Sequence, residues 1–295
     1  MSDEKIKNET GVAGTTETEA AKAESKDRET EPIIRIRDLC FEYTDKKSRF
    51  GALDHIDLDV EKGEFVCILG ASGCGKSTLL NVLAGLYKPG SGKVLVNGKK
   101  ITGPGPDRAV VFQHYSLFPW LTCKGNVLFG LKSGKGKHKY SGKERKEKAM
   151  EYLKNVNLEQ AADKYPDQLS GGMKQRVAVA RALALESDIL LMDEPFGAID
   201  PRLRLELQEL ISALSVEKQK TVIFVTHDID EAILLADRIV VMEPAKIRSV
   251  EEISFPHPRK RADLIRNGEY EKLRLKLTSA FYDQLQDSIG GEVVL

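Results

Sequence analysis

The chain has 295 residues, of which 41% are hydrophobic and 31% are charged, and its 45 basic and 45 acidic residues balance to a net charge of zero. The length suits one large domain or two small ones, and the zero net charge excludes a global electrostatic argument for nucleic acid or an acidic partner. No apolar run approaches the roughly 18 residues of a membrane span, and the N-terminus lacks the apolar core of a signal peptide, so we expect a soluble protein. The four cysteines form no CxxC pair, which indicates neither a disulfide framework nor a zinc site and fits a reducing cytosol.

The first 32 residues are rich in Glu, Lys, Thr, Ala and Gly and have almost no large apolar side chains. Such a segment cannot bury enough surface to offset its chain entropy, so residues 1–32 are predicted to be a disordered tail. Order is expected to begin at Ile33-Ile34-Arg35-Ile36, where apolar and polar residues alternate as they do in a strand.

Five later runs are apolar without alternation, which is typical of parallel strands buried on both faces. These runs are Phe65–Leu69, Ala109–Phe112, Ile189–Met192, Val222–Val225 and Ile239–Met242. Helical patterns lie between several of them, at Leu79–Leu86 and Met173–Leu185. The sequence therefore predicts an α/β fold with a central, mostly parallel sheet, to which Asp59–Leu69 and Gly92–Val96 add antiparallel strands.

Residues 114 to about 168 differ from this pattern and predict a helical subdomain inserted between the strands. Within it, Lys132–Lys148 carries eight Lys or Arg residues and is interpreted as a loop with a solvated surface. A contact with nucleic acid or lipid is the less favoured alternative. The segment lacks the interleaved aromatic residues that stack on bases, since Tyr140 is its single Phe, Trp or Tyr residue.

A phosphate-binding loop is predicted directly after the first buried run. The segment Gly70-Ala71-Ser72-Gly73-Cys74-Gly75-Lys76-Ser77-Thr78 matches the G-x-x-x-x-G-K-[ST] pattern between a predicted strand and a predicted helix. Glycines permit backbone geometry that a side chain would block, so that N–H groups and a helix N-terminus face an anion. Lys76 is expected to reach the β and γ phosphates, and Ser77 to offer its hydroxyl to magnesium.

A second part of the same site is predicted where the run Ile189–Met192 ends in two carboxylates, Asp193 and Glu194. Side chains alternate along a strand, so the two can take different tasks. Asp193 is expected to hold the magnesium shell. Glu194 is expected to orient or deprotonate the attacking water.

The segment Leu169-Ser170-Gly171-Gly172-Met173-Lys174-Gln175-Arg176 resembles the signature of ATP-binding cassette (ABC) proteins. The resemblance extends over residues 33 to about 245, and its parts follow the family's order. It implies a P-loop ABC cassette at 33–250 that binds ATP and Mg²⁺, followed by a helical C-terminal extension at 251–295. It also implies that Ser170, Gly171 and Gly172 form a second anion site, which closes on the ATP of another cassette in a head-to-tail dimer.

The resemblance gives roles to further residues. Gln113, at the end of a strand, meets magnesium or the water and senses the γ-phosphate, and His227 in Thr226-His227-Asp228 matches the switch histidine. The segment that ends in Asp200 resembles the loop that links the two sites of the dimer. Tyr43 resembles the aromatic residue that stacks on adenine, with Phe41 and Phe50 as rivals for that position.

The segment Leu117-Phe118-Pro119-Trp120-Leu121-Thr122 is similar to the nitrate, sulfonate and taurine branch of ABC importers, as is the tail with Pro256-His257-Pro258-Arg259-Lys260-Arg261. The resemblance implies an ATPase on the cytoplasmic face of the membrane, bound to permease subunits. An extracytoplasmic binding protein would deliver the substrate to those subunits. Trp120 is either a surface anchor for the permease or packed within the helical subdomain. The alternatives are an exporter or lipid-extraction motor, or a non-transport ATPase that acts on ribosomes or DNA, although no nucleic acid is expected as a partner.

Overall fold

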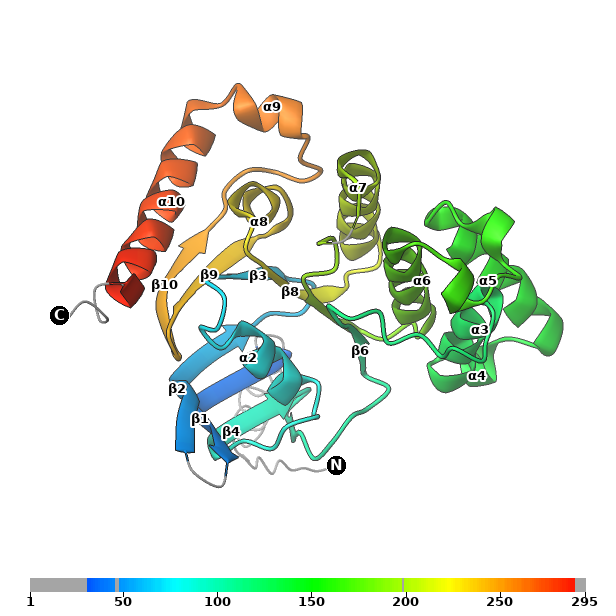
Figure 1. The fold of residues 1–295 in the computed structure, drawn as a ribbon, viewed down its shortest axis with the longest axis horizontal. Helices are drawn as coiled ribbons and strands as arrows, with labels where there is room; N and C mark the ends of the chain where they lie inside the picture. The colour runs from blue at the N-terminus through cyan, green and yellow to red at the C-terminus, as the bar shows by residue number, and fades with distance from the viewer. Residues whose placement is uncertain (1–30, 46–47, 198, 290–295) are drawn as a thin grey trace, which may run out of the picture.

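The computed structural model describes residues 31–45, 48–197 and 199–289, and Figure 1 shows how their helices and strands are arranged. The predicted disordered tail at 1–32 falls almost wholly outside the described residues. The described chain forms two sheets with helices around them, which is the α/β architecture that the sequence predicted.

The larger sheet has six strands in the order β10-β9-β3-β8-β7-β6. Its members are β3 (Phe65–Leu69), β6 (Arg108–Val111), β7 (Ile189–Asp193), β8 (Thr221–Thr226), β9 (Arg238–Glu243) and β10 (Lys246–Glu252). The five predicted apolar runs are confirmed as its parallel strands, and only β10 pairs antiparallel, at the edge. The carboxyl ends of β3, β6, β7 and β8 therefore lie along one edge of the sheet, where ligands of such folds bind.

The smaller sheet is antiparallel and has the order β2-β1-β4-β5. Its members are β1 (Ile34–Asp45), β2 (Ser48–Val60), β4 (Ser91–Val96) and β5 (Lys99–Lys100). The prediction of one antiparallel strand over Asp59–Leu69 is wrong, because β2 ends at Val60 and β3 begins at Phe65 in the other sheet. Gly63 has a left-handed φ of 80° in the turn between them, and its N–H donates to the hydroxyl of Thr221.

Two hydrophobic cores lie on opposite faces of the larger sheet. One is shared with the smaller sheet and with α2 (Lys76–Leu83), whose apolar residues pack between the two sheets. The other joins the opposite face of the sheet to the helices that cover it, including α6 (Gly171–Ala184), α7 (Pro201–Glu217) and α8 (Ile229–Leu235). Because α2 is held from both sides, its N-terminus and the loop before it have a fixed position.

A group of helices between β6 and α6 forms the end of the molecule farthest from the smaller sheet (Figure 1). It contains α3 (Cys123–Ser133), α4 (Gly136–Lys139), α5 (Gly142–Asn155), and the 3₁₀ turns η1 (Glu159–Ala161) and η2 (Pro166–Gln168). The prediction of a basic loop over Lys132–Lys148 is wrong, since most of that segment is helical. Ser141 and Glu144 form a capping box that starts a new helix within the run of charges.

The chain after β10 returns to the larger sheet through α9 (Arg261–Ile265) and α10 (Gly268–Ile289), which runs beside β10 in Figure 1. Before α9, the buried guanidinium of Arg259 donates to the backbone carbonyls of Phe255 and Ile233. These bonds tie the segment to the end of α8. Among the described helices, none is both long and apolar enough to cross a membrane.

Asp230 on α8 is the main polar anchor of α10. It accepts hydrogen bonds from Tyr270 Oη at 2.8 Å, Arg274 Nε at 2.7 Å and a guanidinium nitrogen of Arg261 at 3.1 Å. Partial burial alone would raise the pKa of Asp230, but the hydrogen bonds from Arg274 and Tyr270 outweigh it and lower the pKa. The anchor is therefore strongest when Asp230 is ionised.

Replacing Asp230 with Asn is expected to lower the free energy of unfolding by about 1 kcal/mol, because the partners are partly exposed to water. Since the folded pKa lies below the ordinary value of 3.8, this stabilisation is complete above pH 3.8 and disappears as the pH falls through the folded pKa. Urea unfolding at neutral and acidic pH measures both effects. Asp263→Asn, on the exposed surface of α9, is the control, and an equal loss in both variants would contradict the anchor.

Candidate nucleotide site

The loop between β3 and α2 has a backbone that only glycine adopts easily. Gly73 and Gly75 have left-handed φ values of 84° and 110°. A Cβ atom on Gly70 would lie 2.6 Å from the carbonyl oxygen of Met242, and one on Gly75 would lie 2.4 Å from that of Ala52. The glycines therefore let the loop fit closely against β9 and β2, with the N-terminus of α2 at its end, which is the arrangement that binds phosphates in P-loop proteins.

Lys76 is the first residue of α2, and its ammonium group lies over the loop. Its Nζ donates to the carbonyl oxygens of Gly70 and Ala71, at 2.8 Å in each case. The side chain is buried, so its charge is held at the place where the glycine loop would receive an anion. Cys74 is also buried, and burial raises the pKa of its thiol, so it stays protonated and is a poor nucleophile.

Ser77 and Asp193 lie together at the carboxyl end of β7. The hydroxyl of Ser77 donates to Oδ1 of Asp193 at 3.1 Å. Burial raises the pKa of Asp193, the bond from Ser77 opposes this rise, and the charge of Glu194 adds to it. A hydroxyl and a buried carboxylate are hard oxygen ligands, so this pair fits Mg²⁺, whose binding would favour the ionised carboxylate.

Three predicted catalytic side chains meet at the ends of neighbouring strands. Oε2 of Glu194 accepts from Nε2 of Gln113 at 3.4 Å and lies 3.3 Å from Nδ1 of His227. The three residues follow β6, β7 and β8, which are adjacent in the sheet. Glu194 has a left-handed φ of 43°, and its N–H donates to the carbonyl of Val225. This unusual backbone directs its carboxylate toward the other two side chains, and strain of this kind is concentrated at functional sites.

An open cleft of about 240 Å³ extends from the phosphate loop to the edge of the smaller sheet. It is lined by Tyr43, Phe50, Ala52, Gly73, Gly75, Lys76, Ser77 and Thr78. Tyr43 and Phe50 are cross-strand partners, and Tyr43 Oη lies 3.0 Å from the hydroxyl of Thr78. Phe41 instead stacks on Tyr87 with 5.3 Å between ring centroids. Of the three candidates for adenine stacking, Tyr43 and Phe50 line the cleft and Phe41 does not.

Replacing Tyr43 with Ala is expected to weaken ATP binding about tenfold, since stacking of an aromatic ring on a base contributes about 1–3 kcal/mol. Tyr43→Phe keeps the ring, loses the hydroxyl contacts with Thr78 and Tyr87, and is expected to bind ATP nearly as well as the parent. Titration with a fluorescent ATP analogue measures both affinities. Phe50→Ala is the matched comparison, and a larger loss there than in Tyr43→Ala would transfer the stacking role to Phe50.

The predicted signature residues begin α6. Ser170 is the N-cap, and its hydroxyl accepts from the N–H of Met173 at 3.4 Å, while Gly171 and Gly172 form the first turn. A Cβ on Gly171 would lie 2.8 Å from the hydroxyl of Tyr115, so a larger residue would displace that side chain. Asp200 caps α7 in the same way, by accepting from the N–H of Leu203 at 3.1 Å. Ser170 and Asp200 are both exposed and therefore accessible to a second molecule.

The segment after Gln113 presents an aromatic patch, which we define as Phe118, Trp120 and Phe129. Trp120 is 70% exposed, so it is not packed within the helical subdomain, and Phe129 is 44% exposed. Phe118 lies between them, with ring centroids 5.4 Å from Trp120 and 4.6 Å from Phe129. Phe129 was not predicted from the sequence, where its signal is a single aromatic residue on the exposed side of α3.

A larger cavity, of about 500 Å³, lies away from the phosphate loop, between α5, the end of α6 and the end of α7. Three of its lysines are paired with acids: Lys135 with Asp188 at 2.6 Å, Lys139 with Glu186 at 3.2 Å and Lys148 with Glu151 at 3.0 Å. It has no glycine loop among its lining residues. The geometry therefore favours the smaller cleft as the nucleotide site.

Comparisons with known proteins agree with this geometry. A model of the ABC transporter family matches residues 53–197. The nitrate import ATP-binding protein NrtD of Synechococcus elongatus is 45% identical over 234 residues, which cover 78% of this chain and 85% of that protein. The bicarbonate transport ATP-binding protein CmpC of the same organism is 49% identical over 229 residues, or 77% of this chain. This chain spans only 34% of the length of CmpC.

A solved structure has the same fold. The ATP-binding cassette MJ0796, determined as a dimer in a post-hydrolysis state with ADP and Pi, superposes with a TM-score of 0.70 at 35% sequence identity. The match covers 76% of this chain and 100% of that chain.

Proposed function

The chain belongs to the ABC transporter family of ATPases, and we propose that it powers the uptake of a small anion, such as nitrate, a sulfonate or taurine, through a separate permease. The proposal of ATP hydrolysis rests on the convergence of Gln113, Glu194 and His227 beside the Ser77–Asp193 pair. The import direction and the substrate class are supported by the similarity to NrtD.

In the proposed reaction, the phosphate loop and Lys76 hold the β and γ phosphates, so that the terminal phosphorus is positioned for attack by water. Ser77 and Asp193 would hold Mg²⁺, which neutralises phosphate charge when bound. Glu194 accepts the proton of the attacking water. Gln113 and His227, which both contact the Glu194 carboxylate, position it and respond to the γ-phosphate.

We propose that two cassettes, most simply two copies of this chain, enclose two ATP molecules. The exposed positions of Ser170 and Asp200 leave them available to the nucleotide site of a partner cassette. Ser170, Gly171 and Gly172 would supply a hydroxyl and helix N-terminal N–H groups to the partner's γ-phosphate. The dimeric state of the related cassette MJ0796 supports this arrangement.

The aromatic patch is the proposed permease contact, which would place the chain on the cytoplasmic face of the membrane. Exposed aromatic side chains of this kind are the anchors that carry most of the binding energy at protein interfaces. The patch follows Gln113 closely in sequence, so movement at the γ-phosphate can reach it through a short segment. An extracytoplasmic binding protein would deliver the anion to the permease and would not touch this chain.

Replacing Trp120 with Ala is expected to weaken permease binding by about 2 kcal/mol, or roughly 30-fold, and to spare ATP binding, because Trp120 lies outside the nucleotide cleft. Co-purification with the permease and ATP titration measure the two effects separately. Phe50→Ala is the reverse control, since it alters the nucleotide cleft and leaves the patch intact. Unchanged transport by Trp120→Ala would remove this side chain from the interface.

The proposed function is tested by purifying the tagged chain from detergent-solubilised membranes and identifying its partners by mass spectrometry. A polytopic permease in stoichiometric amount is the expected result, and a neighbouring binding protein can then be tested with nitrate, sulfonates and taurine. Recovery of ribosomal proteins or DNA without a permease would overturn the importer and leave the ATPase in place.

A further inference from the structure

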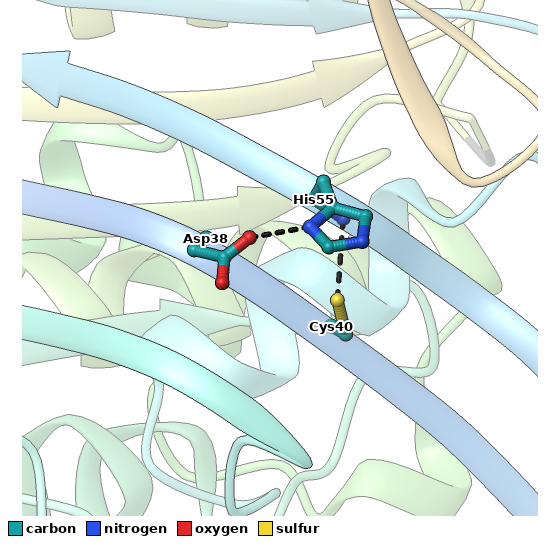
Figure 2. Close-up of side chains that lie close together, drawn as sticks. All are labelled: Asp38, Cys40 and His55. Carbon is teal, nitrogen blue, oxygen red and sulfur yellow. Dashed lines mark hydrogen bonds and ion pairs between the residues drawn. The ribbon is translucent and has the colours of Figure 1, made fainter.

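We propose that Asp38, Cys40 and His55 form a binding site for a divalent transition metal ion, with zinc as the best match. Their ligand atoms, one carboxylate oxygen, one sulfur and one imidazole nitrogen, all lie within 4.8 Å of one another. Figure 2 shows the carboxylate of Asp38 and the sulfur of Cys40 on one strand, both directed toward His55 on the neighbouring strand. The site lies on the smaller sheet and shares no residue with the nucleotide cleft.

The three residues are brought together by irregular pairing of β1 with β2. The register of this pair shifts between Ile36 and Leu39 and again between Leu39 and Phe41. Asp38 and His55 both have a left-handed φ of 52°, which is uncommon for residues with a side chain. Bulges of this kind redirect side chains, and here they bring Asp38 and His55 to the same side as Cys40.

The three ligands have the chemistry that zinc prefers. Zinc binds thiolate sulfur, imidazole nitrogen and carboxylate oxygen, usually with four ligands in a tetrahedron. A thiolate from Cys40 and the carboxylate of Asp38 would balance the two charges of the ion, while neutral His55 adds none. Water would fill the fourth position. Mg²⁺ and Ca²⁺ prefer oxygen ligands and are poorly suited to a site with a cysteine.

The surroundings of the cluster hold its ligands as a metal site requires. His55 Nδ1 contacts Oδ1 of Asp38, and its other nitrogen, Nε2, lies 3.6 Å from Oδ1 of Asp54. A carboxylate on the second nitrogen commonly orients a histidine that binds metal. The backbone N–H of His55 donates to Sγ of Cys40 at 3.3 Å, and the N–H of Asp38 donates to Oδ1 of Asp57 at 3.0 Å. The sulfur of Cys40 and the backbone of Asp38 are thus both held in place before an ion binds.

The charge around the cluster also favours a cation. Asp54 and Asp57 add two carboxylates to that of Asp38. The cations beside them are Lys246, whose Nζ lies 3.1 Å from Oδ2 of Asp54, and Arg37, which is near Asp57 and is itself paired with Asp59. The side chains of Asp38 and His55 are 66% and 69% exposed, so an ion can enter from solvent. Bound metal would join β1 to β2 near the strand ends that carry Tyr43 and Phe50.

The proposal is tested on the full chain, purified with a chelator and a reductant, by titration with Co²⁺ as a spectroscopic substitute for Zn²⁺. We expect one ion per chain and an absorption band from sulfur-to-cobalt charge transfer. Cys40→Ser is expected to abolish that band. Cys67, Cys74 and Cys123 are buried and cannot readily supply it. Competition by Zn²⁺ then gives the zinc affinity, measured with excess Mg²⁺ to keep the Ser77–Asp193 pair from binding the probe.

Two further variants remove a ligand without disturbing the backbone. Asp38→Asn and His55→Asn keep a residue type that tolerates a left-handed φ, and each is expected to weaken zinc binding at least about tenfold. His138→Asn, an exposed histidine on α4, is the matched control and should bind zinc like the parent. Zinc should raise the melting temperature of the parent and of His138→Asn, but not that of Cys40→Ser. Absence of saturable binding in the parent, or an unchanged band in Cys40→Ser, would overturn the proposal.

Discussion

Replacing Glu194 with Gln is expected to lower the rate of ATP hydrolysis by about 10²–10⁴-fold, because the variant lacks the carboxylate that accepts a proton from water. ATP binding should persist, since the amide has the same shape and the phosphate loop is unchanged. A stable dimer with trapped ATP is the expected species, because the two cassettes would close and fail to reopen. Single-turnover hydrolysis and size-exclusion chromatography with labelled ATP measure the two effects.

The matched control for this variant is Glu209→Gln, which removes an exposed carboxylate on α7 and should hydrolyse ATP at the parental rate. If Glu194→Gln also turns over ATP at that rate, Glu194 is not the base. His227 or a phosphate oxygen would then be the group to examine. Loss of ATP binding in Glu194→Gln would instead indicate that the carboxylate, with Gln113 and His227, supports the cleft as a whole.

The sheet was predictable because burial on both faces leaves a strong trace in the sequence. The runs at Phe65–Leu69 and Ile189–Met192 are apolar throughout, and both are inner strands. The turn at Gly63 was overlooked because the polar segment between Val60 and Phe65 is short and lies between two extended segments. Hydrophobic periodicity indicates one continuous extended segment there, and it does not show which sheet each half joins.

The candidate site could be predicted as a set of residues but not as a set of contacts. The phosphate loop, Asp193 and Glu194 are recognisable from their order and from the strands before them. The meeting of Gln113, Glu194 and His227 depends on the order of β6, β7 and β8 in the sheet, which no local pattern contains. Whether Tyr43, Phe41 or Phe50 faces the nucleotide cleft likewise depends on the register of β1 with β2.

The proposed metal-binding cluster of Asp38, Cys40 and His55 is even less predictable from local sequence patterns. Cysteine spacing predicted no zinc site, because Cys40 has no second cysteine nearby and His55 is on the next strand. The cluster arises from irregular strand pairing and from two left-handed residues, neither of which has a reliable sequence signal. The prediction of a loop over Lys132–Lys148 was wrong because charge correctly indicates a solvated surface but does not distinguish a helix from a loop.

Replacing Gly75 with Ala is expected to disrupt the phosphate loop and to lower the free energy of unfolding by at least about 2 kcal/mol. The φ of 110° is strained for alanine, and the added Cβ would lie 2.4 Å from the carbonyl oxygen of Ala52. This neighbour is backbone in β2 and cannot rotate away. The loop must therefore move, and Lys76 and Ser77 move with it, so we also expect ATP affinity to fall at least tenfold. Urea unfolding and ATP titration measure the two quantities.

The control that separates strain from collision is Gly98→Ala. Gly98 has a left-handed φ of 69°, but an added Cβ would meet no atom within 4 Å. We expect a loss of about 1 kcal/mol there from the backbone alone, with no change in ATP affinity. Equal destabilisation by both substitutions would mean that φ strain accounts for the whole effect and that the loop tolerates the contact with β2. A loss of ATP binding at Gly75→Ala without loss of stability would place its role in holding the anion rather than in packing the two sheets together.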